Sequence, residues 1–425
     1  MEREAIPAPG TIEELGIRKN FLEDLALKTM YLIGEMTTLE LAHQMGLGLG
    51  IVSELTERLQ KERFCEVIGL ESGRYFRFTT TSSGKSRALE LLDQSQYSGP
   101  APVSLRAYVG QVLAQSIREM PITPEDLRRT FEDLVLDVQL LNQLGTAAVS
   151  GRAVFLYGPT GTGKTIIAQT LARLFDDQAV WLPYAVEMDG QVITVYDSVL
   201  HQKVERPLSP NQDNRWVLCR RPRVVVGGEL SSDMLDFQFN RSTRYYTAPV
   251  QMKANNGLLI VDDFGRQRIR PEQLLNRWVV PLDRGTDFLT LAGGRKIEIP
   301  FDILVVFATN LEPSTLADEA FLRRIQTKIK IDFVTPDQFR EIFCRVCVQS
   351  NLTCDAPVTD ELLRVIQQEY GEPLRACYPR DIVQHVLWEA RYFQREPRLD
   401  LESLTRACRS YFLARPSGDL PAREK

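Results

Sequence analysis

A glycine-rich segment that ends in lysine and threonine contains the residue types that most clearly indicate a binding or catalytic site. Residues 158–165 read GPTGTGKT and satisfy the spacing G-x-x-x-x-G-K-[ST], which is typical of loops that bind nucleotide phosphates. The glycines allow backbone N–H groups to turn towards phosphate oxygens, and the lysine can reach the terminal phosphates. The sequence therefore predicts a phosphate-binding loop.

Two adjacent carboxylates and an amide follow two later hydrophobic runs. Asp262 and Asp263 come directly after GLLIV, and Asn310 comes directly after DILVVFAT. One carboxylate can hold Mg²⁺ while the next polarises an attacking water, so we expect Asp262 and Thr165 as metal ligands. Asp263 is the expected catalytic base, and ATP and Mg²⁺ are the expected cofactors. The expected nucleotide-binding residues are Gly158, Pro159, Thr160, Gly161, Thr162, Gly163, Lys164, Thr165 and Asp262.

Alternating hydrophobic runs and helical segments predict the elements that position these residues. The run AVFLY precedes the glycine-rich loop and TIIAQTLARLF follows it, as a phosphate loop between a strand and a helix requires. Repeated strand and helix patterns predict an α/β fold with a mostly parallel, five-stranded sheet. The expected strands are AVFLY, AVWLP, GLLIV, DILVVFA and KIKIDF.

Turn signals predict β-hairpin insertions in this domain. Asp189-Gly190 and Gly293-Gly294 each lie between segments of alternating polarity, which is a hairpin pattern. RWVLCRRPRVVVGGE predicts two further strands around a basic turn.

The long stretch between the first two motifs, residues 176–257, carries aromatic and basic residues with two possible roles. Tyr245 and Tyr246 either line a central pore or pack within the inserted ribbon, and packing is the favoured interpretation. Three arginines of this stretch, and three more that follow Asp262 and Asp263, are interpreted as solvated turn charges, with contact to nucleic acid or to a neighbouring chain as the alternative. They are Arg220, Arg221, Arg223, Arg266, Arg268 and Arg270.

The N-terminal residues 1–97 predict helices followed by a two-stranded ribbon and a further helix, which resembles a winged-helix domain. Residues 1–100 contain fifteen acidic and eleven basic residues, a net charge of −4. Because phosphate contacts dominate affinity for DNA, this charge favours docking of a protein. DNA remains the alternative, through the basic residues of the ribbon and the helix that follows it.

Composition and turn signals divide the chain into five parts. After the N-terminal domain, residues 98–150 are expected to form a linker and the first helices of the ATPase module. The α/β nucleotide-binding domain is expected at 151–333, a C-terminal helical lid at 334–415, and a polar tail at 416–425.

The order GPTGTGKT, LLIVDD, FATN, FLRRI and YPRD resembles the AAA+ ATPases over roughly residues 100–415. By this resemblance Asn310 is the sensor-one residue, which orients the attacking water, and Arg380 is the sensor-two residue. The pair Arg323 and Arg324 holds the arginine finger that reaches the ATP of a neighbouring subunit. All three arginines and Asn310 are therefore candidate catalytic residues, and the resemblance implies a homo-oligomer, a hexameric ring. The hairpin before FATN is similar to that of the branch with the MoxR-like proteins.

The resemblance predicts an enzyme, with one departure at the catalytic base. Position 263 carries aspartate where these ATPases usually carry glutamate, and the reach shortens by about 1.5 Å. The expected function is to couple hydrolysis of ATP to ADP and phosphate to remodelling or assembly of a protein partner that the winged helix recruits. The alternative is an ATP-sensing, DNA-binding regulator with weak or no hydrolysis.

Composition indicates a globular protein of several domains. The 425 residues are 44% hydrophobic and 25% charged, with a net charge of −5, so no overall attraction to nucleic acid or anionic membranes is expected. The chain has no run of about 18 apolar residues, so no membrane contact is expected. Seven scattered cysteines, including the CxxC of Cys344 and Cys347, suggest free thiols in the cytoplasm. Three widely spaced histidines predict no metal site of their own.

Overall fold

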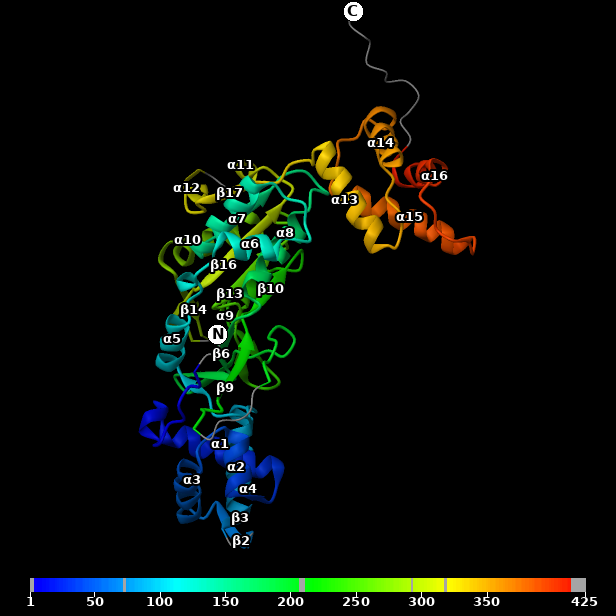
Figure 1. Cartoon of the computed structure of the whole chain (residues 1–425). Helices are drawn as coiled ribbons and strands as arrows, with labels where there is room; N and C mark the ends of the chain where they lie inside the picture. The colour runs from blue at the N-terminus through cyan, green and yellow to red at the C-terminus, as the bar shows by residue number, and fades with distance from the viewer. Residues whose placement is uncertain (1–3, 72–73, 206–210, 292, 317–318, 414–425) are drawn as a thin grey trace, which may run out of the picture.

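The computed structural model places three parts of the chain in sequence along an elongated molecule (Figure 1). The N-terminal helices lie at one end, a β-sheet covered by helices lies in the middle, and the C-terminal helices lie at the other end. The structure describes residues 4–71, 74–205, 211–291, 293–316 and 319–413. The predicted polar tail, 416–425, lies outside the described residues.

A five-stranded sheet forms the centre of the molecule, and its strand order is β10-β13-β16-β5-β17. Every pairing within it is parallel; Val154 of β5, for example, lies opposite Val306 of β16 and Thr327 of β17. The α/β fold with a five-stranded parallel sheet is therefore confirmed. The strands are β5 (Val154–Tyr157), β10 (Arg223–Val226), β13 (Gly257–Val261), β16 (Ile303–Thr309) and β17 (Thr327–Lys330).

Helices bury both faces of this sheet. On one face, α10 contributes the fully buried Trp278, which packs with Phe307 of β16. On the other face, α7 and α8 contribute Leu144 and Leu171 to a core that includes Leu156 of β5. The helices of this part are α6 (Pro124–Thr130), α7 (Val138–Ser150), α8 (Lys164–Ala172), α9 (Val250–Lys253), α10 (Pro271–Arg284), α11 (Pro313–Leu316) and α12 (Glu319–Leu322).

One of the five expected strands lies outside the main sheet, so its predicted place in that sheet was wrong. The run AVWLP forms β6 (Ala179–Pro183), but it pairs antiparallel with β9 (Trp216–Arg220) outside the main sheet. The edge position belongs to β10, because Arg221 is buried and its guanidinium donates to the carbonyl oxygens of Gln115 and Asn256. Those bonds hold the start of β10 beside β13. The interpretation of Arg221 as a solvated charge was also wrong.

Two antiparallel strand pairs lie at Asp189-Gly190 and Gly293-Gly294, whereas the two strands around the basic turn, β9 and β10, pair with other strands. β7 (Ala185–Met188) pairs antiparallel with β8 (Gln191–Thr194), and β14 (Thr286–Thr290) pairs antiparallel with β15 (Lys296–Pro300). Positive φ values at Asp189 and Gly190 make the first turn. A second sheet combines the first hairpin with three short strands, in the order β11-β12-β8-β7-β4. These strands are β4 (Val103–Ser104), β11 (Gln238–Asn240) and β12 (Tyr245–Thr247).

The aromatic pair of β12 packs inside the protein. Tyr246 is buried against Phe237 and Phe239, and Tyr245 contacts Tyr97 edge to face. The packing interpretation is confirmed, because Tyr246 is buried and Tyr245 is partly buried against the N-terminal core. For the buried Tyr246 the pore interpretation is wrong.

The N-terminal unit has three antiparallel strands in the order β1-β3-β2, packed against helices. Thr37 caps α2 through a reciprocal pair of hydrogen bonds with Glu40, a local signal that fixes the start of the helix. The elements are α1 (Lys19–Ile33), β1 (Met36–Thr37), α2 (Thr38–Met45), α3 (Leu49–Lys61), β2 (Cys65–Glu71), β3 (Tyr75–Thr80) and α4 (Ser82–Gln94). A further helix, α5 (Leu105–Ala114), follows this unit.

The C-terminal unit is helical, with a core built from all four of its α-helices. Thr335 caps the first of them through a capping box with Gln338. The helices are α13 (Pro336–Gln349), α14 (Ala356–Arg364) with the π-helical turn η5 (Val365–Glu369), α15 (Tyr378–Tyr392) and α16 (Leu401–Tyr411).

The prediction of free thiols was wrong for one pair of cysteines in this unit. Cys344 of α13 forms a disulfide with Cys354. Asn351 has a φ of 55°, which reverses the chain just after α13 and returns Cys354 to the helix. Cys347, the other half of the CxxC, is a buried free thiol in the helical core.

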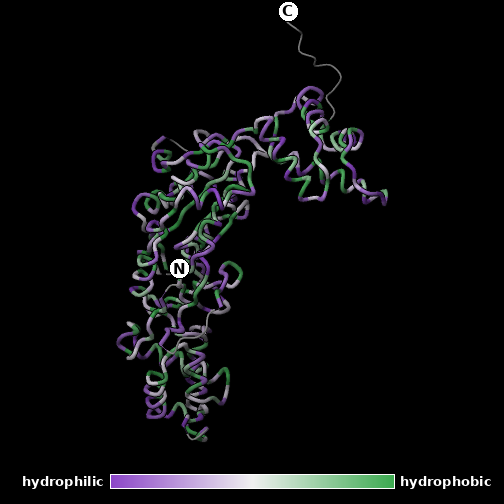
Figure 2. The backbone as a smooth tube through the Cα atoms, viewed as in Figure 1, coloured by the Kyte–Doolittle hydropathy of each residue, from purple (hydrophilic) through white to green (hydrophobic). Residues whose placement is uncertain are grey.

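Hydrophobic and hydrophilic segments alternate along the tube in all three parts of the molecule (Figure 2). Among the described residues, no helix has the length and apolar character that crossing a membrane requires.

Candidate nucleotide-binding site

The glycine-rich loop runs from the end of β5 to the start of α8, as its motif predicts. Gly158, Gly161 and Gly163 all have positive φ values, a conformation that glycine adopts without strain. A Cβ atom at Gly158 would lie 2.1 Å from the carbonyl oxygen of Ile331. The chain therefore needs glycine here to pass β17 closely and still turn into the helix.

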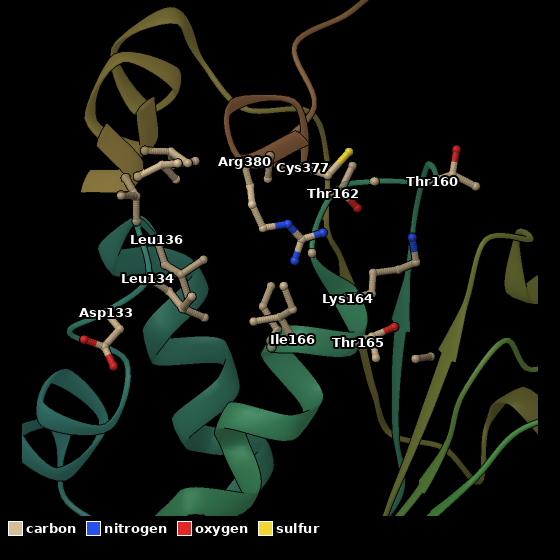
Figure 3. Close-up of a pocket in the computed structure, with 18 of the residues that line it drawn as sticks. Asp133, Leu134, Leu136, Thr160, Thr162, Lys164, Thr165, Ile166, Cys377 and Arg380 are labelled. Atoms are coloured by element: carbon tan, nitrogen blue, oxygen red, sulfur yellow. The ribbon is translucent and has the colours of Figure 1, made fainter. Parts of the chain in front are cut away.

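A cavity of about 700 Å³ lies against this loop, between the sheet and the C-terminal helices (Figure 3). Its polar wall includes residues 160–165, Asp262, Asp263 and Asn310. The rest of the lining includes a group of apolar residues, Leu134, Val135, Leu136, Ile166, Ile342 and Val346. Such a division suits a ligand with an anionic end and a flat apolar end, as a nucleotide has.

Lys164 lies inside the arch of the loop. Its Nζ donates to the carbonyl oxygen of Pro159 over 2.6 Å, and the residue is 7% exposed. Burial lowers the pKa of Lys164, while the negative charges of Asp263 and Asp262 act in the opposite direction. Because an ammonium group buried in this way is poorly solvated, an anion in the cavity would be a favourable partner for it.

The two expected metal ligands are neighbours. The Thr165 hydroxyl donates to Asp262 Oδ1 over 2.9 Å, which brings two oxygen donors from α8 and the end of β13 together. Mg²⁺ prefers oxygen ligands and is usually bound by one or two protein oxygens together with phosphates and water. This donor set therefore fits Mg²⁺, which when bound with ATP would neutralise charge on the phosphates.

The expected base and the expected water-orienting amide also meet. Asn310 Nδ2 donates to Asp263 Oδ1 over 3.4 Å. Asp263 has a φ of 48°, a left-handed conformation that aspartate and asparagine tolerate better than most residues. The ends of β13 and β16 are tied together just beyond these side chains, because the Thr309 hydroxyl donates to the carbonyl oxygen of Phe264 over 2.7 Å.

Gln267 is a residue of this site that sequence reasoning missed. Its Nε2 donates to the carbonyl oxygens of Asp262 and Asp263 over 2.8 and 3.2 Å, and its Oε1 accepts from the N–H of Gly265 over 2.8 Å. These bonds hold the turn that presents both carboxylates. The only local signal is a glutamine a few residues after the acids, which no motif distinguishes.

For the ATP hydrolysis that the sequence predicts, replacing Gln267 with alanine is expected to lower kcat about tenfold, since the turn loses two or three neutral hydrogen bonds worth about 1 kcal/mol each and only part of that loss reaches the transition state. The KM for ATP should change less than about threefold, because Gln267 does not line the cavity. Steady-state kinetics measure both, with the exposed Gln273→Ala of α10 as control. A raised KM at unchanged kcat would contradict this positioning role.

The candidate arginines divide into two groups. Arg380 lines the cavity, and its side chain extends from α15 towards the phosphate loop (Figure 3). Arg323 and Arg324 do not line it. Arg323 pairs with Glu319 over 2.7 Å and is 76% exposed at its side chain, while Arg324 pairs with Asp283 over 2.8 Å. Within one chain the structure therefore brings together every expected site residue except this pair.

Comparisons with known proteins each cover part of the chain. Residues 335–410, the C-terminal helices, match a family described as a domain of unknown function, DUF8689. The chain is 31% identical over 94 residues to the uncharacterized protein YojN of Bacillus subtilis. That match spans 20% of this chain and 29% of YojN, so it covers less than a third of that protein's length.

Solved structures with a related arrangement are distant. NtrX from Brucella abortus in complex with ADP is 13% identical, with a TM-score of 0.39 over 65% of this chain and 56% of that chain. The complex of NtrX with ATP is 12% identical, with a TM-score of 0.38 over 62% of this chain and 54% of that chain. RuvB of Thermotoga maritima, a Holliday junction branch migration motor, is 16% identical, with a TM-score of 0.36 over 68% of this chain and 70% of that chain. The match thus spans little more than half the length of NtrX.

Proposed function

We propose that this chain is an AAA+ ATPase of the branch with a hairpin before sensor one, and that it couples Mg-ATP hydrolysis to remodelling or assembly of a protein partner. One observation carries this proposal. A single cavity collects the phosphate loop, the two acids that follow β13, Asn310 after β16, and Arg380 of α15. These are the groups that binding and cleaving a triphosphate require, and they come from four segments that are distant in the sequence.

Each residue has a defined task in this proposal. The loop N–H groups and Lys164 hold the phosphates, and Thr165 with Asp262 would hold Mg²⁺. Asp263 takes a proton from the attacking water, which Asn310 helps to orient. Arg380 contributes positive charge from the C-terminal helices, which we propose act as the lid domain of the ATPase.

Replacing Lys164 with alanine is expected to weaken ATP binding by at least about 30-fold, because the phosphates lose a buried, charge-assisted partner. Titration with a fluorescent ATP analogue in the presence of Mg²⁺ measures this loss. The exposed Lys296→Ala of β15 is the matched control and should bind as the wild type does. An unchanged affinity in the Lys164 variant would remove the phosphate-loop assignment and the proposed function with it.

The N-terminal unit is proposed to be a winged helix that recruits the protein partner. Its element order α1-β1-α2-α3-β2-β3-α4, with β2 and β3 as the ribbon, supports this assignment. Charge supports a protein rather than DNA, because its basic side chains face acidic ones. Arg77 of the ribbon pairs with Glu71, and Arg58 of α3 lies 3.1 Å from Glu23 and 3.6 Å from Glu62. Cations neutralised within the unit contribute little to binding phosphates.

A homo-oligomer, as a hexameric ring, is part of the proposal. Arg323 and Arg324 lie outside the cavity of their own chain on the short segment before β17. For either arginine of this pair to act on a γ-phosphate, that phosphate must be bound by a neighbouring copy. The expected effect of removing the pair is large and is argued in the Discussion.

A further inference from the structure

The C-terminal helices contact the phosphate loop at a second place, away from Arg380. Arg375, in the segment before α15, donates through Nη1 to the carbonyl oxygen of Thr160 over 3.1 Å and to its hydroxyl over 2.6 Å. Two residues later, the backbone N–H of Cys377 donates to the carbonyl oxygen of Gly161 over 3.1 Å. Consecutive loop carbonyls are therefore both bound by one short segment of the C-terminal unit.

This approach depends on glycine in the loop. A Cβ atom at Gly161 would lie 2.8 Å from the sulfur of Cys377 and 3.2 Å from Cδ of Arg375. Gly161 also has a φ of 76°, so any other residue would be strained. Glycine at position 161 therefore allows both the turn of the loop and the close contact of residues 375–377 with it.

Arg375 is held in place by its own surroundings. Its guanidinium lies 5.8 Å from the ring centroids of both Phe333 and Tyr378, and it lies 3.5 Å from the carboxylate of Glu372. Tyr378 donates in turn to Glu372 over 3.2 Å. Only a quarter of the Arg375 side chain is exposed. Contacts that fix a long side chain before it binds reduce the entropy lost on binding.

The two arginines near the loop have different partners. The Arg380 side chain lines the cavity, is 66% exposed and pairs with its neighbour Asp381. Arg375 is engaged with the loop itself. Its contacts lie on the carbonyl side of peptide units, whereas a phosphate loop uses the N–H groups of such units to hold the anion.

We propose that Arg375 is a positioning residue that couples the placement of the C-terminal helices to the affinity of the phosphate loop for nucleotide. A cation at the carbonyl end polarises a peptide unit and strengthens hydrogen bonding at its N–H end. Contacts of Arg375 and Cys377 with Thr160 and Gly161 thus favour phosphate binding. Because such coupling is reciprocal, bound nucleotide also favours the seated position of the helices. This inference rests on the proposed nucleotide site.

The test compares the full-length wild-type protein with Arg375→Ala and Arg375→Lys. Titration with a fluorescent ATP analogue in Mg²⁺ should show about a tenfold weaker Kd for Arg375→Ala, the equivalent of losing one charged hydrogen bond. Arg375→Lys retains the charge, and its Kd for the analogue should be about threefold higher than that of the wild type. Arg340→Ala, which removes an exposed arginine of α13 that pairs with Asp337 and Asp360, is the control and should bind normally.

Hydrogen exchange separates coupling from a general structural effect. At saturating nucleotide, the wild type should protect both the loop, residues 158–165, and the segment 374–380. In Arg375→Ala, nucleotide should slow amide exchange in the loop but not in the segment 374–380. The core of α13 should exchange as in the wild type. A Kd within twofold of the wild type with nucleotide protection of 374–380 intact would overturn the proposal, as would exchange that rises throughout the C-terminal helices.

Failure of the proposed function would look different. If the wild type bound no ATP analogue, the nucleotide site would be wrong, and the contact could still be tested without ligand. Exchange of residues 158–165 in nucleotide-free protein should rise in Arg375→Ala and remain unchanged in Arg340→Ala. Equal exchange in all three proteins would overturn the role of Arg375 as well.

Discussion

Alanine at both Arg323 and Arg324 is expected to reduce ATP hydrolysis about 1000-fold while the affinity for ATP changes less than about threefold. An arginine supplied to the γ-phosphate by a neighbouring subunit stabilises charge that develops in the transition state, and its loss costs on the order of 10³-fold or more. The pair lies outside the cavity of its own chain, so binding should survive. Phosphate release at saturating ATP and a nucleotide titration measure the two effects.

A matched control exists on α6. Arg128 and Arg129 are also adjacent, are 65% and 69% exposed at their side chains, and pair with acids three residues earlier. Alanine at both of these positions should leave hydrolysis unchanged. Full activity in the Arg323 and Arg324 variant would exclude the pair from the site.

Mixing two inactive variants tests whether the arginines act between chains. A subunit without Arg323 and Arg324 keeps its own base, and an Asp263→Asn subunit keeps its arginines. In an equal, random mixture, about one interface in four joins an intact base to an intact arginine pair, so about a quarter of wild-type activity should return. No recovery from a mixture that demonstrably exchanges subunits would contradict catalysis in trans.

The parts of the site that could be predicted are those in which local sequence determines geometry. Glycine spacing in residues 158–165 fixes the phosphate loop because only glycine adopts the required backbone angles there. Asp262, Asp263 and Asn310 could be placed at one edge of the sheet because all strands of a parallel sheet end at the same edge. That they lie close together depends on β13 and β16 being neighbours, which the structure shows.

The parts that could not be predicted depend on contacts between distant segments. β6 and β10 are both short apolar runs, and periodicity does not say which one joins the sheet. The choice follows from buried Arg221, which bonds to Gln115 and Asn256, and neither partner is near it in the sequence. Gln267 and Arg375 belong to no motif. Their roles emerge from hydrogen bonds to backbone carbonyls, which leave no pattern in side-chain types.

The replacement Asp263→Asn is expected to reduce ATP hydrolysis by at least about 100-fold and to leave ATP bound, because the amide cannot accept the proton of the attacking water. Asparagine is nearly isosteric, tolerates the left-handed backbone at this position and keeps an oxygen for the Asn310 amide. The loss should therefore come from chemistry rather than folding. Phosphate release and quantification of nucleotide retained after gel filtration measure both parts.

Asp263→Glu provides the informative counterpart to that variant. It keeps a carboxylate and adds about 1.5 Å of reach, so turnover should stay within about tenfold of the wild type or exceed it. If Asp263→Asn turned over ATP as fast as the wild type, another group would be the base. If both variants were inactive but bound ATP, the position would require aspartate itself. In the expected case, the ATP-bound Asp263→Asn protein is the form with which to search for the proposed partner.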